Sequence, residues 1–326
     1  MARRKQPFSC GLSDSLLAEM GHLPLDRLHH DVDAICRAAD AARPLAERLG
    51  LAPPRPHLAG FCYPHVTTLG AQVVFAEGSE PNVAPCIHSP EQIDDLREPD
   101  DYLQAGVVPE RLATLAELKH RRPDAANTIG HLYEGPVTTA ALLMGTDFFL
   151  LPTDDPARAH RLLRFCVDSA VAYARAISAR LGSPLRPGGR GIPDDFAGIF
   201  SPAQFAEFVV PYWDRMYEKL DATRRSLHSE LLRVEHLHHL ADLRIATFDP
   251  SADQYVTPEL LRDHCPVAFT GRIQSWHIRD HTAAELQQMY RRIASCEPVS
   301  ISFYMKELAD EPKIRALLDV ARELAA

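Results

Sequence analysis

The sequence lacks the features of a membrane-spanning or exported protein. No run of residues approaches the roughly 20 apolar residues that cross a bilayer. Residues 1–17 (MARRKQPFSCGLSDSLL) also lack the apolar segment of a secretory signal. We therefore expect a cytoplasmic protein without a membrane partner.

Cysteine pairs and an excess of positive charge are missing as well. The seven cysteines are an odd number and include no Cys-x-x-Cys, so the sequence predicts neither a disulfide framework nor a zinc knuckle. The 35 Lys and Arg residues are outnumbered by 44 Asp and Glu residues, which gives a formal net charge of −9. Because a surface of this sign repels phosphate backbones, we expect no nucleic-acid partner.

The chain does contain enough apolar residues for one large domain, since 46% of its 326 residues are hydrophobic. Residues 1–56 have helical periodicity up to a proline cluster and predict an N-terminal helical cap. Residues 57–326 alternate short apolar runs with helical periods, which is typical of an α/β fold of the (β/α)8 TIM-barrel type. The predicted strands are Leu58–Cys62, Gln72–Phe75, Asn127–His131, Gly191–Asp195, Ser226–His228, Ile245–Asp249, Val267–Ile273 and Val299–Phe303.

Reactive residues of a TIM barrel lie where strands end and βα loops begin. A strand of a parallel sheet is buried on both faces and is normally apolar throughout, so a polar residue at its carboxyl end is a candidate site residue. The residues that meet this criterion are Cys62, Asp194, Asp195, His228, Asp249 and Arg272.

The segment His228-Ser229-Glu230 follows a short predicted strand. Residues two apart in an extended chain project to the same side, so this imidazole and this carboxylate can converge on a divalent metal ion. The next predicted strand ends at Asp249, with Asp253 close behind it, and would add one or two carboxylates. The predicted metal ligands are thus His228, Glu230 and Asp249. A His–Asp hydrogen bond that only closes the barrel rim is the alternative.

Three other groups of residues could carry chemistry. Of the adjacent carboxylates Asp194 and Asp195, one could act as a general acid or base, or the pair could cap the helix that follows. His65 could supply an imidazole, although an isolated histidine is more often structural. The histidines at 236–239 favour a solvated helix surface over a metal cluster, because on a helix only the first and the last of them share a face.

Several motifs together resemble the uroporphyrinogen decarboxylase superfamily of TIM barrels. The sequence GPVT at 135–138 resembles a turn of that superfamily, and residues 194–212, from DDFAG to EFVVPY, are similar to its most specific stretch. Weaker landmarks, such as TGRI at 270–273, follow in the same order. The resemblance extends from about residue 58 to the end of the chain.

The superfamily includes uroporphyrinogen decarboxylase and the methylcobamide:coenzyme M methyltransferases. The decarboxylases grip their substrate with an arginine-rich N-terminal motif, whereas the corresponding HLAGFCYPH at 57–65 contains no arginine. The methyltransferases bind zinc through His-x-Cys after the fifth strand and a cysteine after the eighth. Here His228 matches the histidine, Glu230 replaces the cysteine, and residues 300–305 contain no cysteine. The resemblance implies the methyltransferase-like branch.

Three functional hypotheses follow. In the first, a metal-dependent methyltransferase-like enzyme activates a small thiol or similar acceptor, and Asp194 or Asp195 orients the substrate or acts as base. Zinc is the expected metal, a ligand set of histidine and carboxylates also suits manganese or iron, and a corrinoid, free or on a partner protein, is a candidate methyl donor. In the second, a lyase or decarboxylase holds a small organic acid with Arg272, and His65 or Asp195 moves the proton. The third is a non-catalytic corrinoid- or metal-handling protein. A homodimer is the commonest assembly for such chains.

Overall fold

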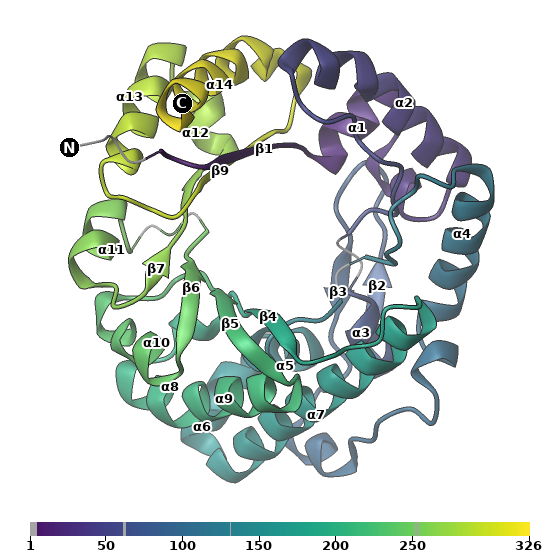
Figure 1. Ribbon diagram of the computed structural model, residues 1–326. Helices are drawn as coiled ribbons and strands as arrows, with labels where there is room; N and C mark the ends of the chain where they lie inside the picture. The colour runs from purple at the N-terminus through teal and green to yellow at the C-terminus, as the bar shows by residue number, and fades with distance from the viewer. Residues whose placement is uncertain (1–4, 61–62, 131, 252, 254) are drawn as a thin grey trace.

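The computed structural model describes residues 5–60, 63–130, 132–251, 253 and 255–326. Figure 1 shows a TIM barrel, in which helices form an outer ring around parallel strands. The strands form two parallel sheets, and each sheet curves along part of the ring. One sheet has the order β4 (Gly188–Pro193), β5 (Ala222–His228), β6 (Ile245–Asp249) and β7 (Ala268–Phe269). The other has the order β1 (Phe8–Leu12), β9 (Ile301–Met305) and β8 (Gly271–Ile273).

Four of the strands expected in the second half of the chain are confirmed within about four residues. The fifth, Val267–Ile273, is wrong as a single strand, because β7 pairs with β6 and β8 pairs with β9, in different sheets. Towards the carboxyl ends of these strands, the outward-facing residues are apolar and buried beneath the helices, as Ile192, Leu227 and Phe248 are. The residues between them, such as Ser226 and Thr247, line a cavity inside the barrel. This alternation follows from the two-residue period of a strand, and it places polar side chains among the apolar residues that line the cavity.

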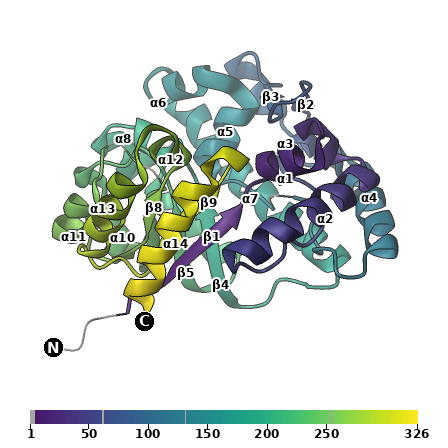
Figure 2. The same ribbon diagram turned by 90° about the horizontal axis from the view of Figure 1, so that it is seen from above.

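The sequence predicts helices throughout residues 1–56, but the first described element of the N-terminal segment is a strand. Strand β1 pairs in parallel with β9, from Phe8 opposite Ile301 to Leu12 opposite Met305, and is therefore part of the barrel. Figure 2 shows β1 beside β9, with the last helix, α14 (Glu311–Ala325), next to them. Helices α1 (Asp14–Gly21) and α2 (Val32–Leu49) follow the strand, joined by the 3-10 helix Leu25–His29.

The strand predictions in the first half of the chain are largely wrong. Residues 58–60 and 127–130 form no strand, and the ends of those two predictions fall outside the described residues. The guanidinium of the buried Arg111 instead donates to the carbonyl oxygens of Ile129, of His29 at 3.2 Å and of Ala59 at 2.8 Å. Strand β2 (Gln72–Val74) exists, but it forms an antiparallel hairpin with β3 (Asn82–Ala84).

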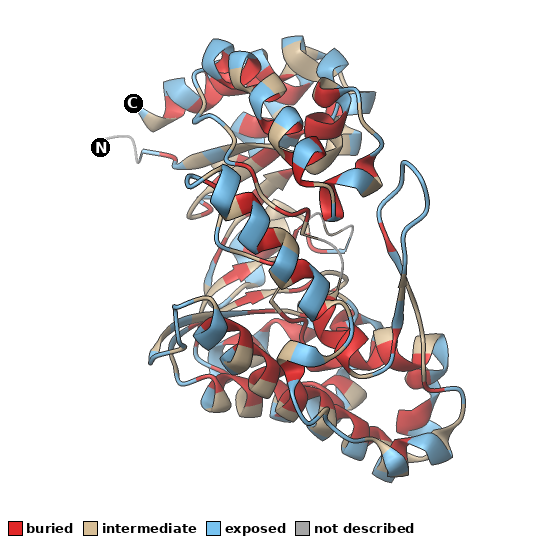
Figure 3. Ribbon diagram, turned by 90° about the vertical axis from the view of Figure 1, so that its right-hand side faces the viewer, coloured by how far each residue is buried: buried red, intermediate tan, exposed pale blue. Residues whose placement is uncertain are grey.

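The sequence also predicts helix starts at Ser201-Pro202, Thr257-Pro258 and Thr282, and N-caps confirm all three. The side chains of Ser201, Thr257 and Thr282 each accept a hydrogen bond from the backbone N–H three residues later. Figure 3 shows that the helices bury one side and expose the other. The remaining helices are α3 (Pro64–Thr68), α4 (Val108–Arg121), α5 (Pro136–Met144), α6 (Leu151–Asp154), α7 (Pro156–Arg180), α8 (Pro202–Phe208), α9 (Val210–Lys219), α10 (His238–Asp242), α11 (Pro258–His264), α12 (Ser275–Asp280) and α13 (Ala283–Ala294).

Two further features bear on the expectations from the sequence. None of the described helices combines the length and the apolar character needed to cross a membrane. The six cysteines among the described residues are unpaired, as expected, and Cys62 lies outside those residues.

Candidate active site

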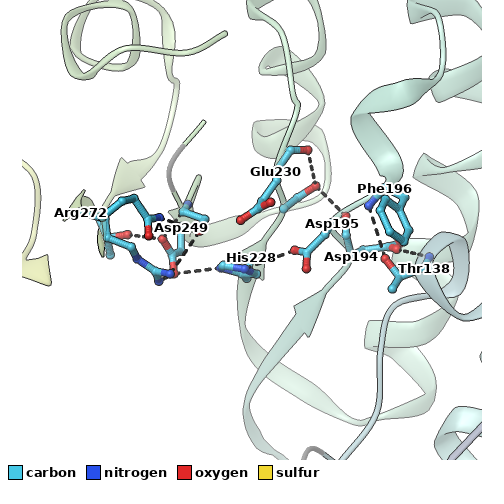
Figure 4. A network of polar contacts seen from close by, with 12 residues as sticks. Thr138, Asp194, Asp195, Phe196, His228, Glu230, Asp249 and Arg272 are labelled. Carbon is cyan, nitrogen blue, oxygen red and sulfur yellow. Dashed lines mark hydrogen bonds and ion pairs between the residues drawn. The ribbon is translucent and has the colours of Figure 1, made fainter. Parts of the chain in front are cut away.

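Three consecutive parallel strands bring the candidate site together at the carboxyl end of the barrel. His228 is the last residue of β5, and it lies opposite Pro193 of β4 and Asp249 of β6 in the strand register. Asp195 follows β4 by two residues. Figure 4 shows the side chains of Asp195, His228 and Asp249 in one row. His228 and Asp249 line a cavity of about 460 Å³ in the barrel mouth, as predicted from the strand ends.

The imidazole of His228 lies between two carboxylates. Its Nδ1 is 3.0 Å from Oδ2 of Asp249, and its Nε2 is 3.2 Å from Oδ1 of Asp195. Burial disfavours the charged imidazolium, but the two carboxylates outweigh burial and raise the pKa of His228 to about 10. In the absence of a metal ion, His228 is thus protonated at neutral pH.

Asp249 is itself held by a cation and by hydrogen bonds. The Arg272 guanidinium donates to Oδ2 at 2.6 Å, while the Thr270 hydroxyl and the Ser251 backbone N–H donate to Oδ1 at 2.9 and 3.0 Å. Burial opposes ionisation, but the hydrogen bond from His228 and the charge of Arg272 lower the pKa of Asp249 to about 2. Asp249 is therefore an ionised carboxylate that orients His228.

Asp195, His228 and Glu230 form a group that could hold a metal ion. Each offers one ligand atom, and these atoms lie within 4.8 Å of one another. Oδ1 of Asp195 is buried without a well-aligned hydrogen-bond donor among the described residues, which fits an atom that faces a metal ion. The geometry therefore favours Asp195 over the predicted Asp249 as the third ligand, because Asp249 contacts the opposite ring nitrogen and the Arg272 side chain. Asp253 lies near Glu230, and its pKa is raised by burial and by the Glu230 carboxylate.

Asp194 does not face the cavity, although it was a candidate acid or base. Its side chain is fully buried and accepts hydrogen bonds from the backbone N–H groups of Val137 and Thr138, at 3.3 and 2.6 Å, and from the indole of Trp213 at 2.6 Å. Burial raises the pKa of Asp194 to about 6 against the effect of these donors. The residue connects the end of β4 to helices α5 and α9, and it cannot contact a substrate in this arrangement.

His65 lies in α3, where it is nearly fully buried. Its Nε2 is 3.1 Å from the hydroxyl of Ser169, and its ring centroid is 5.2 Å from that of Tyr173. Burial lowers the pKa of His65 to about 3, so the side chain is neutral at pH 7. None of its described contacts reaches His228, and a neutral, packed imidazole of this kind is suited to a structural role.

One acidic residue of the site was missed in the sequence. Glu134 is buried, and its pKa is raised well above the usual range by burial and by the charges of Asp195 and Asp194. In the sequence, Glu134 is distinguished only by its position directly before the GPVT turn. It belongs to no predicted strand or motif. Glu134 therefore places a buried carboxyl group close enough to Asp195 and Asp194 to interact with their charges.

The histidines at 236–239 form a second, separate cluster. His238, His239 and Asp242 of α10 could also hold a metal ion, and His238 and Asp242 are exposed. His236, in contrast, is buried and stacks on Phe205 with ring centroids 4.5 Å apart. The expectation of a solvated surface therefore holds for His238 and is wrong for His236.

Comparisons with known proteins agree with this architecture. Residues 63–302 match the family described as uroporphyrinogen decarboxylase (URO-D). No curated protein matches the sequence. Among solved structures, the fold is similar to that of a methyltransferase from Methanosarcina mazei, with a TM-score of 0.70 and 16% sequence identity over 99% of this chain and 95% of that one. Because the family match covers most of the chain and includes the strands that carry the site, the protein belongs to the uroporphyrinogen decarboxylase family.

Proposed function

We propose that this protein is a metal-dependent methyltransferase-like enzyme that transfers a methyl group to a small thiol or similar acceptor. The observation that carries the proposal is the group of Asp195, His228 and Glu230 at the barrel mouth, with ligand atoms within 4.8 Å of one another. The similarity in fold to a solved methyltransferase supports it. The absence of arginine from residues 57–65 argues against a substrate with several carboxylates.

The three residues offer one imidazole nitrogen and two carboxylate oxygens. This set suits zinc, and because it contains no sulfur it also suits manganese or iron. When bound, the metal would lower the pKa of a substrate thiol so that the thiolate forms at neutral pH. Asp249 would keep a proton on Nδ1 of His228, which leaves the Nε2 lone pair for the metal.

The methyl transfer itself needs few protein groups. The thiolate sulfur forms a bond to the methyl carbon while the bond from that carbon to the donor breaks, and the donor keeps the bonding electron pair. A methylated corrinoid would be a suitable donor, because its cobalt would keep that pair and be released in the reduced cobalt(I) form. The cavity of about 460 Å³ has room for a small thiol beside His228. While Oδ1 of Asp195 faces the metal, its Oδ2 could accept the thiol proton.

The alternative of a lyase or decarboxylase is less well supported. It requires Arg272 to bind a substrate carboxylate, but the guanidinium donates to Asp249 at 2.6 Å and to the Ser251 hydroxyl at 3.2 Å. It also assigns proton transfer to His65 or Asp195, and of these His65 contacts Ser169 in the protein interior through Nε2. A substrate carboxylate would have to displace Asp249 from Arg272.

The proposal is tested by measuring thioether formation. The zinc-, manganese- or iron-loaded protein is incubated with methylcobalamin and a panel of small thiols, and the methylated product is quantified by mass spectrometry. We expect turnover in the wild type and a loss of at least about 100-fold in Glu230→Gln, because the metal-bound thiolate no longer forms. Glu235→Gln, an exposed carboxylate five residues away, should retain wild-type activity. No thioether with any of the three metals would contradict the proposal and favour a non-catalytic role.

A further inference from the structure

A second cavity lies beside the candidate active site. It has a volume of about 290 Å³ and is enclosed by the chain that follows β6, by the strands β7 and β8, and by helices α11 to α13. We call it the side pocket. Its walls are mainly apolar, and they include the side chains of Val256, Leu261, Phe269, Trp276, Met289 and Ile293.

The side pocket adjoins the metal-binding group through shared residues. Thr270 lines both cavities, and Arg272 lines the side pocket while its guanidinium donates to Asp249. Asp249 in turn contacts His228 at 3.0 Å. A molecule in the side pocket would therefore lie next to the residues that hold the reacting groups.

The two arginines that line the side pocket are already paired. Arg272 donates to Asp249 at 2.6 Å, and Arg292 forms an ion pair with Glu259 at 2.6 Å. An anionic ligand would have to break one of these pairs, so the pocket favours a ligand without net charge.

Two polar atoms in the wall lack partners among the described residues. One is Nε of Arg272, a donor, and the other is Oδ2 of Asp253, an acceptor, and both are buried. A buried polar atom without a partner costs free energy, so a ligand that offers both an acceptor and a donor gains from binding here. A hydroxyl group has both properties.

The aromatic side chains and the volume of the side pocket suit a ligand that contains a ring. Trp276 is 45% exposed, and both Trp276 and Phe269 line the pocket. An apolar protein cavity of about 150 Å³ already accommodates benzene, so one of 290 Å³ has room for a substituted ring. Ring stacking on Trp276 would favour an aromatic ligand over a saturated one.

We propose that the side pocket binds a neutral aromatic group that carries a hydroxyl, with the hydroxyl between Arg272 and Asp253 and the ring against Trp276. The aromatic group would be part of the small-molecule substrate, so that the pocket selects phenol-like substrates. This assignment to the substrate rests on the proposed function. Binding to the pocket itself requires no metal ion.

The test uses phenol, cyclohexanol and benzoate as probes in ligand-observed NMR titrations of the chelator-treated protein. Phenol has both the ring and the hydroxyl, cyclohexanol lacks the aromatic ring, and benzoate is an anion. We expect saturable binding of phenol, binding of cyclohexanol that is weaker by about threefold to tenfold, and no saturation with benzoate. Absence of phenol saturation, or benzoate binding as tight as that of phenol, would overturn the proposal.

Two variants assign the binding to this pocket. Trp276→Ala changes an exposed side chain and should weaken phenol binding about threefold to tenfold, while Met289→Phe should narrow the cavity and abolish saturation. Phe75→Ala, an exposed aromatic residue next to β2, is the matched control and should bind phenol like the wild type. Unchanged binding in both pocket variants would overturn the assignment. Because no metal is present in these titrations, their failure is distinct from a failure of the metal-dependent reaction.

Discussion

Asp249 contacts both the imidazole of His228 and the guanidinium of Arg272 through one oxygen. Its Oδ2 lies 3.0 Å from Nδ1 of His228 and 2.6 Å from the Arg272 guanidinium. Because the pKa of Asp249 is lowered to about 2, the carboxylate remains ionised over the whole physiological range. A charged partner at Nδ1 fixes the tautomer of His228 and leaves Nε2 as the ligand atom.

Replacement of Asp249 should therefore weaken metal binding without removing a ligand. We expect Asp249→Asn to lower zinc affinity about tenfold to 100-fold, because the partner that orients His228 loses its charge. Calorimetric titration of zinc into chelator-treated protein measures the effect. Asp263→Asn, an exposed carboxylate of α11, is the control and should bind zinc like the wild type. Equal affinities in Asp249→Asn and the wild type would show that Asp249 does not act through His228.

The buried imidazole of His65 should make the free energy of unfolding of the protein depend on pH. Its pKa is about 3 in the folded protein and about 6.5 in an unfolded chain. As the pH falls below 6.5, the unfolded state gains a proton that the folded state does not, so the free energy of unfolding decreases by up to about 1.4 kcal/mol per pH unit.

Urea unfolding of the wild type and of His65→Gln at pH 7 and pH 5 checks this dependence. The wild type should lose about 2 kcal/mol more than the variant between the two pH values, because only the wild type carries the buried imidazole. His29, another buried histidine with a lowered pKa, contributes equally to both proteins. Equal losses in the two proteins would mean that His65 is not kept neutral by the fold.

The connection between β4 and α5 depends on a close approach of backbone and side chain. Gly135 precedes α5, and a Cβ atom at this position would lie 2.4 Å from the side chain of Asp194. The sequence identified both residues as parts of motifs. It could not show which of Asp194 and Asp195 faces inward, because that depends on the residue at which β4 ends and on the helices that pack against it.

A methyl group at Gly135 should push the end of β4 away from the start of α5. We expect Gly135→Ala to destabilise the protein by about 1–3 kcal/mol, since Asp194 would have to move away from the N–H groups of α5. Gly188→Ala is the matched control, because a Cβ atom there would meet its nearest neighbour at 3.6 Å. Thermal unfolding of both variants gives the comparison, and equal melting temperatures would contradict the close contact.

Prediction from the sequence succeeded where an element has a strong local pattern. Strand β6 was predicted with its observed bounds, and the N-caps of α8, α11 and α13 were recognised from Ser-Pro, Thr-Pro and Thr residues. Strand β1 was missed because its sequence FSCGL is short, contains a glycine, and is stabilised by pairing with β9 at the other end of the chain. Such long-range pairing leaves little trace in the local sequence.

The barrel as a whole was predictable from the alternation of apolar runs and helical periods, but its closure was not. On the side formed by residues 55–60 and 126–130, backbone carbonyls bind the side chain of Arg111 instead of neighbouring strands. A buried arginine that replaces strand hydrogen bonds has no sequence signature. Arg111 shares this role with other hydrogen bonds, such as the one from the Ala126 N–H to the Pro56 carbonyl at 2.9 Å, but it is the buried side chain that joins three segments here.

Removal of that side chain should destabilise the entire domain. Arg111→Met keeps an apolar stem but leaves the carbonyl oxygens of His29, Ala59 and Ile129 without this donor, and we expect a loss of at least about 3 kcal/mol. Lys119→Met, on the same helix α4, removes a weaker contact to the Ala125 carbonyl and should cost less than about 1 kcal/mol. Denaturant unfolding measures both, and similar losses in the two variants would contradict the role of Arg111.

The central claim is that Asp195, His228 and Glu230 hold a metal ion, and the metal content of purified protein tests it most directly. Wild type, Glu230→Gln and His238→Ala are loaded with zinc and dialysed, and the metal in each is measured by mass spectrometry. The variant His238→Ala removes a ligand of the exposed cluster on α10 and controls for surface binding. We predict one zinc ion per chain in the wild type and in His238→Ala, and a steep loss in Glu230→Gln. A wild type without bound metal, or a Glu230→Gln variant that retains its ion, would contradict the claim.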